Sequence, residues 1–184
     1  IIKGGRVIDP ANKRDGLFDI CIDKGKIKSV AKAGQLPKPD LDGAKVIDAT
    51  NSVVTPGFID MHVHFREPGF EYKETIESGC RSAAAGGFTS VAVMPNTHPV
   101  NDSRAVTEMM QTQALSHGIA NVYVIPAVSM GLKGEQLTDM AELAETGAVG
   151  FSDDGRPVVS NELMRRALEY SKMFDLPIIQ HSEI

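Results

Sequence analysis

Residues 55–69 read TPGFIDMHVHFREPG. In this stretch an apolar run leads into His62 and His64, which stand two residues apart. Successive side chains of a β-strand point to opposite faces, so both histidines lie on one face if the run is a strand. The stretch therefore predicts a strand that carries two neighbouring imidazoles at its C-terminal end.

Downstream of this strand, apolar runs alternate with segments of helical character. Further strands are expected over 89–96, 121–128, 148–154 and 177–182, and helices over 71–87, 103–118, 133–147 and 160–175. Repeated β–α units imply a parallel sheet, and the apolar strands imply that both sheet faces are covered. A doubly wound sheet and a (β/α)₈ barrel both fit, but no GxGxxG follows the first strand. Polar residues instead end each strand, which is where (β/α)₈ barrels build their active sites.

The N-terminal part of the chain has a different character. Residues 18–23 alternate apolar and polar side chains, 45–50 are expected to form another short strand, and 35–43 is a loop rich in Pro, Asp and Gly. We expect an α/β protein with a small β-sandwich module over 1–54 and the N-terminal part of a barrel over 55–184. About five strands are present where a complete barrel needs eight, so the chain is expected to be part of a longer protein.

Composition excludes several classes of protein. The chain has 184 residues, a net charge of -5 and no basic stripe, which argues against nucleic acid as a partner. No apolar run approaches the roughly 18 residues of a membrane span, and the N-terminus lacks the apolar core of a signal peptide. Cys21 and Cys80 lie far apart and outside any CxxC motif, as expected for free thiols in a reducing compartment. Together these features predict a cytoplasmic protein.

The polar residues at the strand ends suggest a metal site. A catalytic zinc ion needs about three protein ligands and one open position. His181, at the end of IIQHS, offers a third imidazole, and Asp153 and Asp154 end the run AVGFSDD. Adjacent side chains point to opposite faces, so one aspartate should face the metal while the other supports a ligand or caps the loop. Each residue alone also fits a purely structural role, but their combination favours metal binding.

Two further residues could bind an anionic group. Arg66 stands two residues beyond His64, and Asn96 ends the run VAVMPN. Arginine holds a carboxylate through two parallel hydrogen bonds, and an asparagine amide can donate and accept beside it. A solvated loop charge and a turn residue are the alternative interpretations. Neither residue by itself predicts a ligand site.

The segments PGFIDMHVHFREPG, AAAGGFTSVAVMPNT, GFSDDG and IIQHSE together resemble the dihydroorotase family, type I bacterial branch, of the amidohydrolase superfamily. The resemblance implies that His62 and His64 hold one zinc ion and that His181 holds a second. It also implies that Asp154 bridges the two ions, where many relatives have a carboxylated lysine. Arg66, Asn96 and His64 are expected to contact the substrate.

The resemblance implies zinc-dependent, reversible hydrolysis of the cyclic amide of dihydroorotate to N-carbamoyl-aspartate in pyrimidine biosynthesis. It also implies a homodimer, with aspartate transcarbamoylase as a further partner. The catalytic aspartate is expected beyond residue 184, so the chain alone is expected to be inactive. The alternatives are a hydantoinase or allantoinase, whose substrates lack the ring carboxylate that Arg66 would bind, and a non-catalytic scaffold subunit for aspartate transcarbamoylase. A scaffold should have lost metal ligands, whereas His62, His64, Asp154 and His181 are all present.

Overall fold

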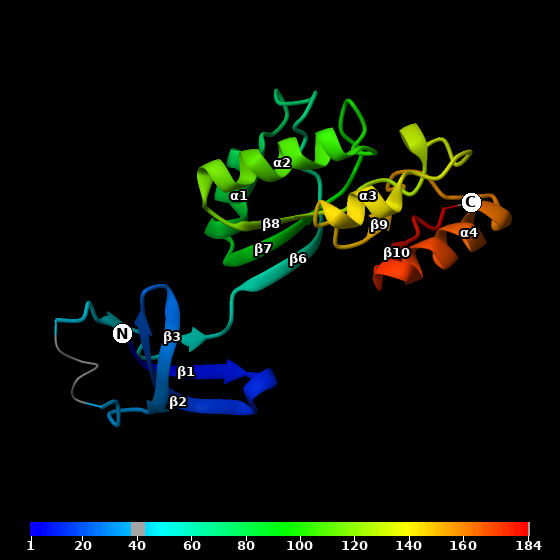
Figure 1. Cartoon of the computed structure of the whole chain (residues 1–184). Coiled ribbons are helices and arrows are strands. Elements are labelled where there is room, and N and C mark those ends of the chain that lie inside the picture. Colours follow the sequence, from blue (N-terminus) through cyan, green and yellow to red (C-terminus); the bar gives the residue numbers. More distant parts are fainter. Residues whose placement is uncertain (38–42, 184) are drawn as a thin grey trace. The chain divides into compact units, whose positions relative to one another are not determined.

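The computed structural model describes residues 1–37 and 43–183, and the chain divides into two compact units, Ile1–Pro56 and Gly57–Ile184 (Figure 1). Most of the loop expected over 35–43 lies outside the described residues. The expectation that the first unit belongs to a β-sandwich and the second to a (β/α)₈ barrel stays a prediction. In the part of the chain that is described, no helix is both long and apolar enough to cross a membrane.

The first unit is a mixed β-sheet. Its strands are β1 (Ile2–Asp9), β2 (Arg14–Asp23), β3 (Lys26–Lys32), β4 (Ile47–Asp48) and β5 (Val53–Val54), with a short 3₁₀ turn η1 (Pro10–Asn12) between the first two. β1, β2 and β3 pair antiparallel, whereas β4 and β5 both run parallel to β1. The buried carboxylate of Asp19 accepts hydrogen bonds from the backbone N–H groups of Gly4 at 2.8 Å and Gly34 at 2.7 Å. Within the described residues this unit is one five-stranded sheet.

The second unit contains the expected parallel strands. Strands β6 (Phe58–Val63), β7 (Phe88–Val93) and β8 (Asn121–Val124) form one parallel sheet, and β9 (Phe151–Ser152) pairs parallel with β10 (Ile178–Ile179). Two backbone hydrogen bonds connect these groups, from Val149 N to Val124 O at 3.1 Å and from Ser152 N to Pro126 O at 3.0 Å. The described strands do not close a barrel.

Helices connect these strands in the predicted order, but several elements are shorter than expected. The helices are α1 (Ile76–Ala85), α2 (Arg104–His117), α3 (Met140–Glu145) and α4 (Asn161–Ser171), with 3₁₀ turns η3 (Met130–Leu132) and η4 (Lys172–Phe174). α1 begins five residues later than the expected start at 71, because Thr75 and Ser78 form a reciprocal capping box there. The helix expected over 133–147 starts only after Asp139, whose carboxylate accepts the Glu142 N–H at 3.1 Å.

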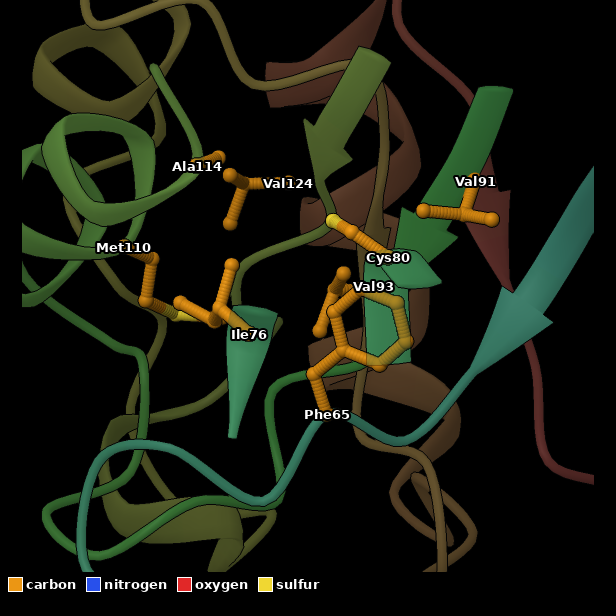
Figure 2. Packing of buried hydrophobic residues seen from close by; sticks show 8 residues of the cluster. All are labelled: Phe65, Ile76, Cys80, Val91, Val93, Met110, Ala114 and Val124. Carbon is orange, nitrogen blue, oxygen red and sulfur yellow. The ribbon is translucent and has the colours of Figure 1, made fainter. Parts of the chain in front are cut away.

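A buried apolar cluster fixes the end of β6 to the helices. Figure 2 shows its members, which come from the loop after β6, from α1 and α2, and from β7 and β8: Phe65, Ile76, Cys80, Val91, Val93, Met110, Ala114 and Val124. Phe65 directly follows His64, and its ring lies against Gly79 on α1. Burial of an aromatic side chain of this size stabilises the fold by about 2–3 kcal/mol. The cluster thereby holds the backbone that carries the two histidines.

Candidate metal centre

Four of the predicted ligands meet at the C-terminal ends of three strands. His62 is on β6, His64 lies just beyond it, Asp154 follows β9, and His181 follows β10. One oxygen of the Asp154 carboxylate lies 3.3 Å from His62 Nε2 and 3.3 Å from His181 Nδ1, while the other lies 3.5 Å from His64 Nε2. Asp154 is thus the shared neighbour of all three imidazoles.

Burial differs within this group. The Asp154 side chain is only 6% exposed, whereas those of His62 and His64 are 51% and 29% exposed. A buried carboxylate is costly unless it is paired or binds a metal. The imidazoles reach it from the open side, which leaves a route by which a ligand can enter.

The donor atoms fit a bound cation. Ligand atoms of His62, His64 and Asp154 all lie within 4.8 Å of one another. The two histidine Nε2 atoms are 3.2 Å apart. Two neutral imidazoles that both present lone pairs at this separation repel each other unless a proton or a metal ion lies between them. Imidazole nitrogen and carboxylate oxygen are both ordinary zinc ligands, so these residues can hold zinc.

Asn96 orients one of the imidazoles. Its Oδ1 lies 2.9 Å from His64 Nδ1, and its Nδ2 lies 3.5 Å from an Asp154 oxygen. A carboxylate only accepts, so the amide N–H₂ group faces Asp154 and the amide oxygen faces the imidazole. His64 Nδ1 must then carry the proton and donate it to Asn96, which leaves the Nε2 lone pair directed toward His62 and Asp154. This partner fixes the tautomer that a metal ligand needs.

Arg66 lies in the loop that follows His64. This loop contacts the loop that contains His98. The Arg66 guanidinium forms no hydrogen bond or ion pair with the described residues, so its donors are available to a ligand. The backbone of this loop is held in place, because Pro68 O accepts the His98 N–H at 2.9 Å. At Gly69, with φ +96°, an added Cβ would lie 2.0 Å from His98 O, so only glycine allows this close approach.

The two adjacent aspartates face different partners. Asp153 is buried, and its carboxylate accepts hydrogen bonds from the N–H of Ser129 at 2.9 Å and from the Ser129 hydroxyl. Burial raises the pKa of Asp153, and the hydrogen bonds from Ser129 oppose this effect. Strand parity predicts that only one aspartate can face the histidines, and in the structure that residue is Asp154.

Ser129 is a site residue that the sequence analysis did not single out. It lies just after the apolar run that contains β8, so its position at a strand end was the only available signal. Its partnership with Asp153, 24 residues away, depends on how β8 and β9 lie next to each other.

Comparison with known proteins identifies similar sequences along the whole chain. The family model described as dihydro-orotase-like matches residues 51–183. The dihydroorotase of Geobacter sulfurreducens is 53% identical over 183 residues, which cover 100% of this chain and 42% of that protein. The dihydroorotase of Anaeromyxobacter sp. strain K is 53% identical over 182 residues, 99% of this chain and 41% of that protein. The chain thus spans about two fifths of the length of these curated relatives.

Solved structures share the fold. The L-hydantoinase from Arthrobacter aurescens matches with a TM-score of 0.82 and 22% identity, over 99% of this chain and 40% of that one. A D-hydantoinase from Thermus sp. matches with a TM-score of 0.66 and 26% identity, over 96% of this chain and 38% of that one. A structure described as a dihydroorotase matches with a TM-score of 0.60 and 14% identity, over 96% of this chain and 49% of that one.

Proposed function

The chain belongs to the dihydroorotase-like family, and from this membership we propose that it forms the N-terminal part of a zinc-dependent dihydroorotase. The full-length enzyme would catalyse reversible hydrolysis of the cyclic amide of dihydroorotate to N-carbamoyl-aspartate. The observation that carries this proposal is the meeting of His62, His64 and Asp154, with ligand atoms within 4.8 Å, in a chain that is 53% identical to curated dihydroorotases.

His62, His64, Asp154 and His181 would hold the zinc ions, two in each full-length subunit, with Asp154 between them. When bound, zinc would lower the pKa of water far below its bulk value, to about 7, and would polarise a carbonyl group. The position of Asp154 supports this bridging role, because its carboxylate lies within 3.3–3.5 Å of the imidazoles assigned to both ions, those of His62 and His64 and that of His181. Asn96 would keep His64 in the tautomer that binds metal through Nε2.

Arg66 and Asn96 would bind the carboxylate of dihydroorotate, with His64 contacting the substrate beside them. Arg66 supports this role because its guanidinium lacks a partner among the described residues and lies two residues from a ligand. A bidentate arginine pair fixes the orientation of a carboxylate, so the amide bond to be cleaved is presented in one register. The proton transfers would be carried out by an aspartate from the remainder of the enzyme.

We extend the proposal to the whole protein. Strands β6–β10 would be the first five of a (β/α)₈ barrel, because they run parallel and alternate with helices. The N-terminal sheet would be part of a β-sandwich. The enzyme would act in cytoplasmic pyrimidine biosynthesis as a homodimer, and it could also associate with aspartate transcarbamoylase.

Zinc content and dihydroorotate turnover of the full-length polypeptide test the proposal. We expect His62→Ala and Asp154→Ala to lower both zinc content and kcat/KM. The matched control is His117→Ala, which removes an imidazole at the end of α2 that lies 3.7 Å from Glu77 and outside the metal cluster, and it should leave both unchanged. A wild-type protein without zinc would overturn the catalytic proposal, and a zinc-loaded protein without turnover would favour the scaffold subunit.

The structural match to hydantoinases supports a second candidate, a cyclic amidohydrolase that acts on neutral hydantoins. Arg66 separates the two because only dihydroorotate offers it a carboxylate. Loss of a hydrogen bond to a charged group costs about 1.5–3 kcal/mol, so Arg66→Ala should lower kcat/KM for dihydroorotate by roughly 10- to 100-fold or more. Arg66→Lys keeps the charge without the bidentate geometry and should recover only part of the loss. An equal loss for a neutral hydantoin would refute the carboxylate assignment.

A further inference from the structure

Asp153 is a buried charged residue that the proposed mechanism does not use. It is 2% exposed, it neighbours the proposed ligand Asp154 along the chain, and its carboxylate faces away from the histidines. Both of its oxygens accept hydrogen bonds from Ser129, one from the N–H at 2.9 Å and one from the hydroxyl. These hydrogen bonds join the segment around Ser129 to the end of β9.

The Ser129 loop is itself held at several points. Ser129 is fully buried, and its hydroxyl oxygen accepts the N–H of Gly134 at 2.8 Å while donating to Asp153. On the same loop, the N–H of Gly131 donates to Asp102 Oδ2 at 2.8 Å. Residues 129–134 are therefore fixed to the loop after β7 and to the end of β9, and they offer Asp153 a rigid partner.

This arrangement affects the proposed metal site through the peptide that joins the two aspartates. Consecutive Cα atoms are about 3.8 Å apart and their side chains point in opposite directions, so a tilt of this peptide moves both carboxylates. Metal–ligand distances are held within about 0.2 Å in proteins, so a small displacement of Asp154 would weaken binding. The contact between Asp153 and Ser129 resists such a tilt.

We propose that Asp153 is a positioning residue, which through its paired hydrogen bonds with Ser129 fixes the strand end at which Asp154 faces the three histidines. The inference rests on the proposed function, because it takes Asp154 as a metal ligand. It goes further by assigning the two aspartates of the DDG sequence separate tasks. Asp154 binds the metal, and Asp153 fixes the position of the Asp154 backbone.

Two variants in the full-length polypeptide test this role. Asp153→Asn keeps the size of the side chain, but only one of its two terminal atoms can accept a hydrogen bond from Ser129. Ser129→Ala removes the hydroxyl without changing a charge, so it also decides the question if Asp153→Asn does not fold. The matched control is Thr107→Val, which removes another fully buried hydroxyl, bonded at 2.7 Å to Asn101 Oδ1 and remote from the histidines along the chain.

The readouts are the zinc dissociation constant, measured by competition with a chelator, and the visible absorption spectrum of the cobalt-substituted protein. Loss of a residue that orients a ligand typically costs 10- to 100-fold in metal affinity, so we expect about this loss for Asp153→Asn and a change in the cobalt spectrum. Ser129→Ala should also weaken zinc binding, and the double variant should bind zinc only slightly more weakly than either single variant. Thr107→Val should lower the thermal midpoint while leaving the zinc affinity and the spectrum unchanged.

The outcomes separate this inference from the proposed function. If the variants lose thermal stability but bind zinc and cobalt as the wild type does, Asp153 is only structural and the inference is overturned. If the wild-type protein itself binds neither metal, the proposed function fails. Normal metal binding by the wild type with weakened binding by Asp153→Asn and Ser129→Ala supports the positioning role.

Discussion

Gly79 on α1 is a position at which one added methyl group should disturb both the core and the proposed metal site. In Gly79→Ala the new Cβ would lie 2.2 Å from Cε1 and 2.4 Å from Cδ1 of Phe65. Non-bonded carbon atoms prefer about 3.5–4.0 Å, so the ring would have to retreat by more than about 1 Å. Phe65 is buried in a packed cluster and directly follows His64, so its displacement pulls on the backbone of the proposed ligand.

Two opposing effects set the magnitude. Overpacking of a core costs about 1–3 kcal/mol, and the overlap with a rigid ring places this site at the upper end of that range. Replacing glycine by alanine inside a helix contributes about 1 kcal/mol of stability. We therefore expect Gly79→Ala to lower the free energy of unfolding by about 2 kcal/mol net.

A double-mutant cycle isolates the contact. Phe65→Leu alone leaves space beside Gly79, and the alanine methyl partly fills that space in the double variant. Urea unfolding followed by circular dichroism should then show that the two losses do not add, with a coupling of more than about 0.5 kcal/mol. Additive losses, or a Gly79→Ala protein as stable as the wild type, would refute the steric reasoning.

Three further predictions concern single groups. Burial raises the pKa of the Cys80 thiol. The stability that this shift contributes is fully present below the ordinary thiol pKa of about 8.5 and is lost as the pH rises above that value. The urea midpoint should therefore fall over this pH range, and it should fall less in Cys80→Ala. Thr75→Ala removes the capping box of α1 and should cost about 1 kcal/mol of unfolding free energy, whereas Thr75→Ser should restore most of it. Gly69→Ala places a Cβ 2.0 Å from His98 O at a left-handed φ, so the Arg66 loop must move; KM for dihydroorotate should rise while zinc content stays constant, and an unchanged KM would contradict the role assigned to this loop.

The parallel strands and the nature of the site follow from local patterns in the sequence. The run that ends in His62 and His64 predicts a strand with two imidazoles on one face, and the structure places both near Asp154. The parallel strands β6, β7 and β8 follow from apolar runs that alternate with helical segments. Strand parity and alternation are properties of neighbouring residues, so a sequence can reveal them.

The predicted boundaries of helices are less accurate than their order, because contacts with other segments compete with helix propensity. The helix expected over 133–147 shrinks to α3 (Met140–Glu145), because residues 134–138 hydrogen-bond back to 128–130. That earlier segment is in turn held by Asp102 and Asp153. These partners lie 24 or more residues away along the chain. Propensity within a window of residues contains no information about such contacts.

The sequence by itself determined which residues could bind a metal: the two histidines after one apolar run, an aspartate pair after another, and His181 after the last. Only the tertiary structure decided which atoms meet. The order of parallel strands brings Asp154 within 3.3–3.5 Å of three imidazoles and turns Asp153 toward Ser129. The physical reason is that strand alternation states only that the side chains of Asp153 and Asp154 point to opposite faces. The packing of β9 beside β8 and β10 decides which of these faces carries the histidines.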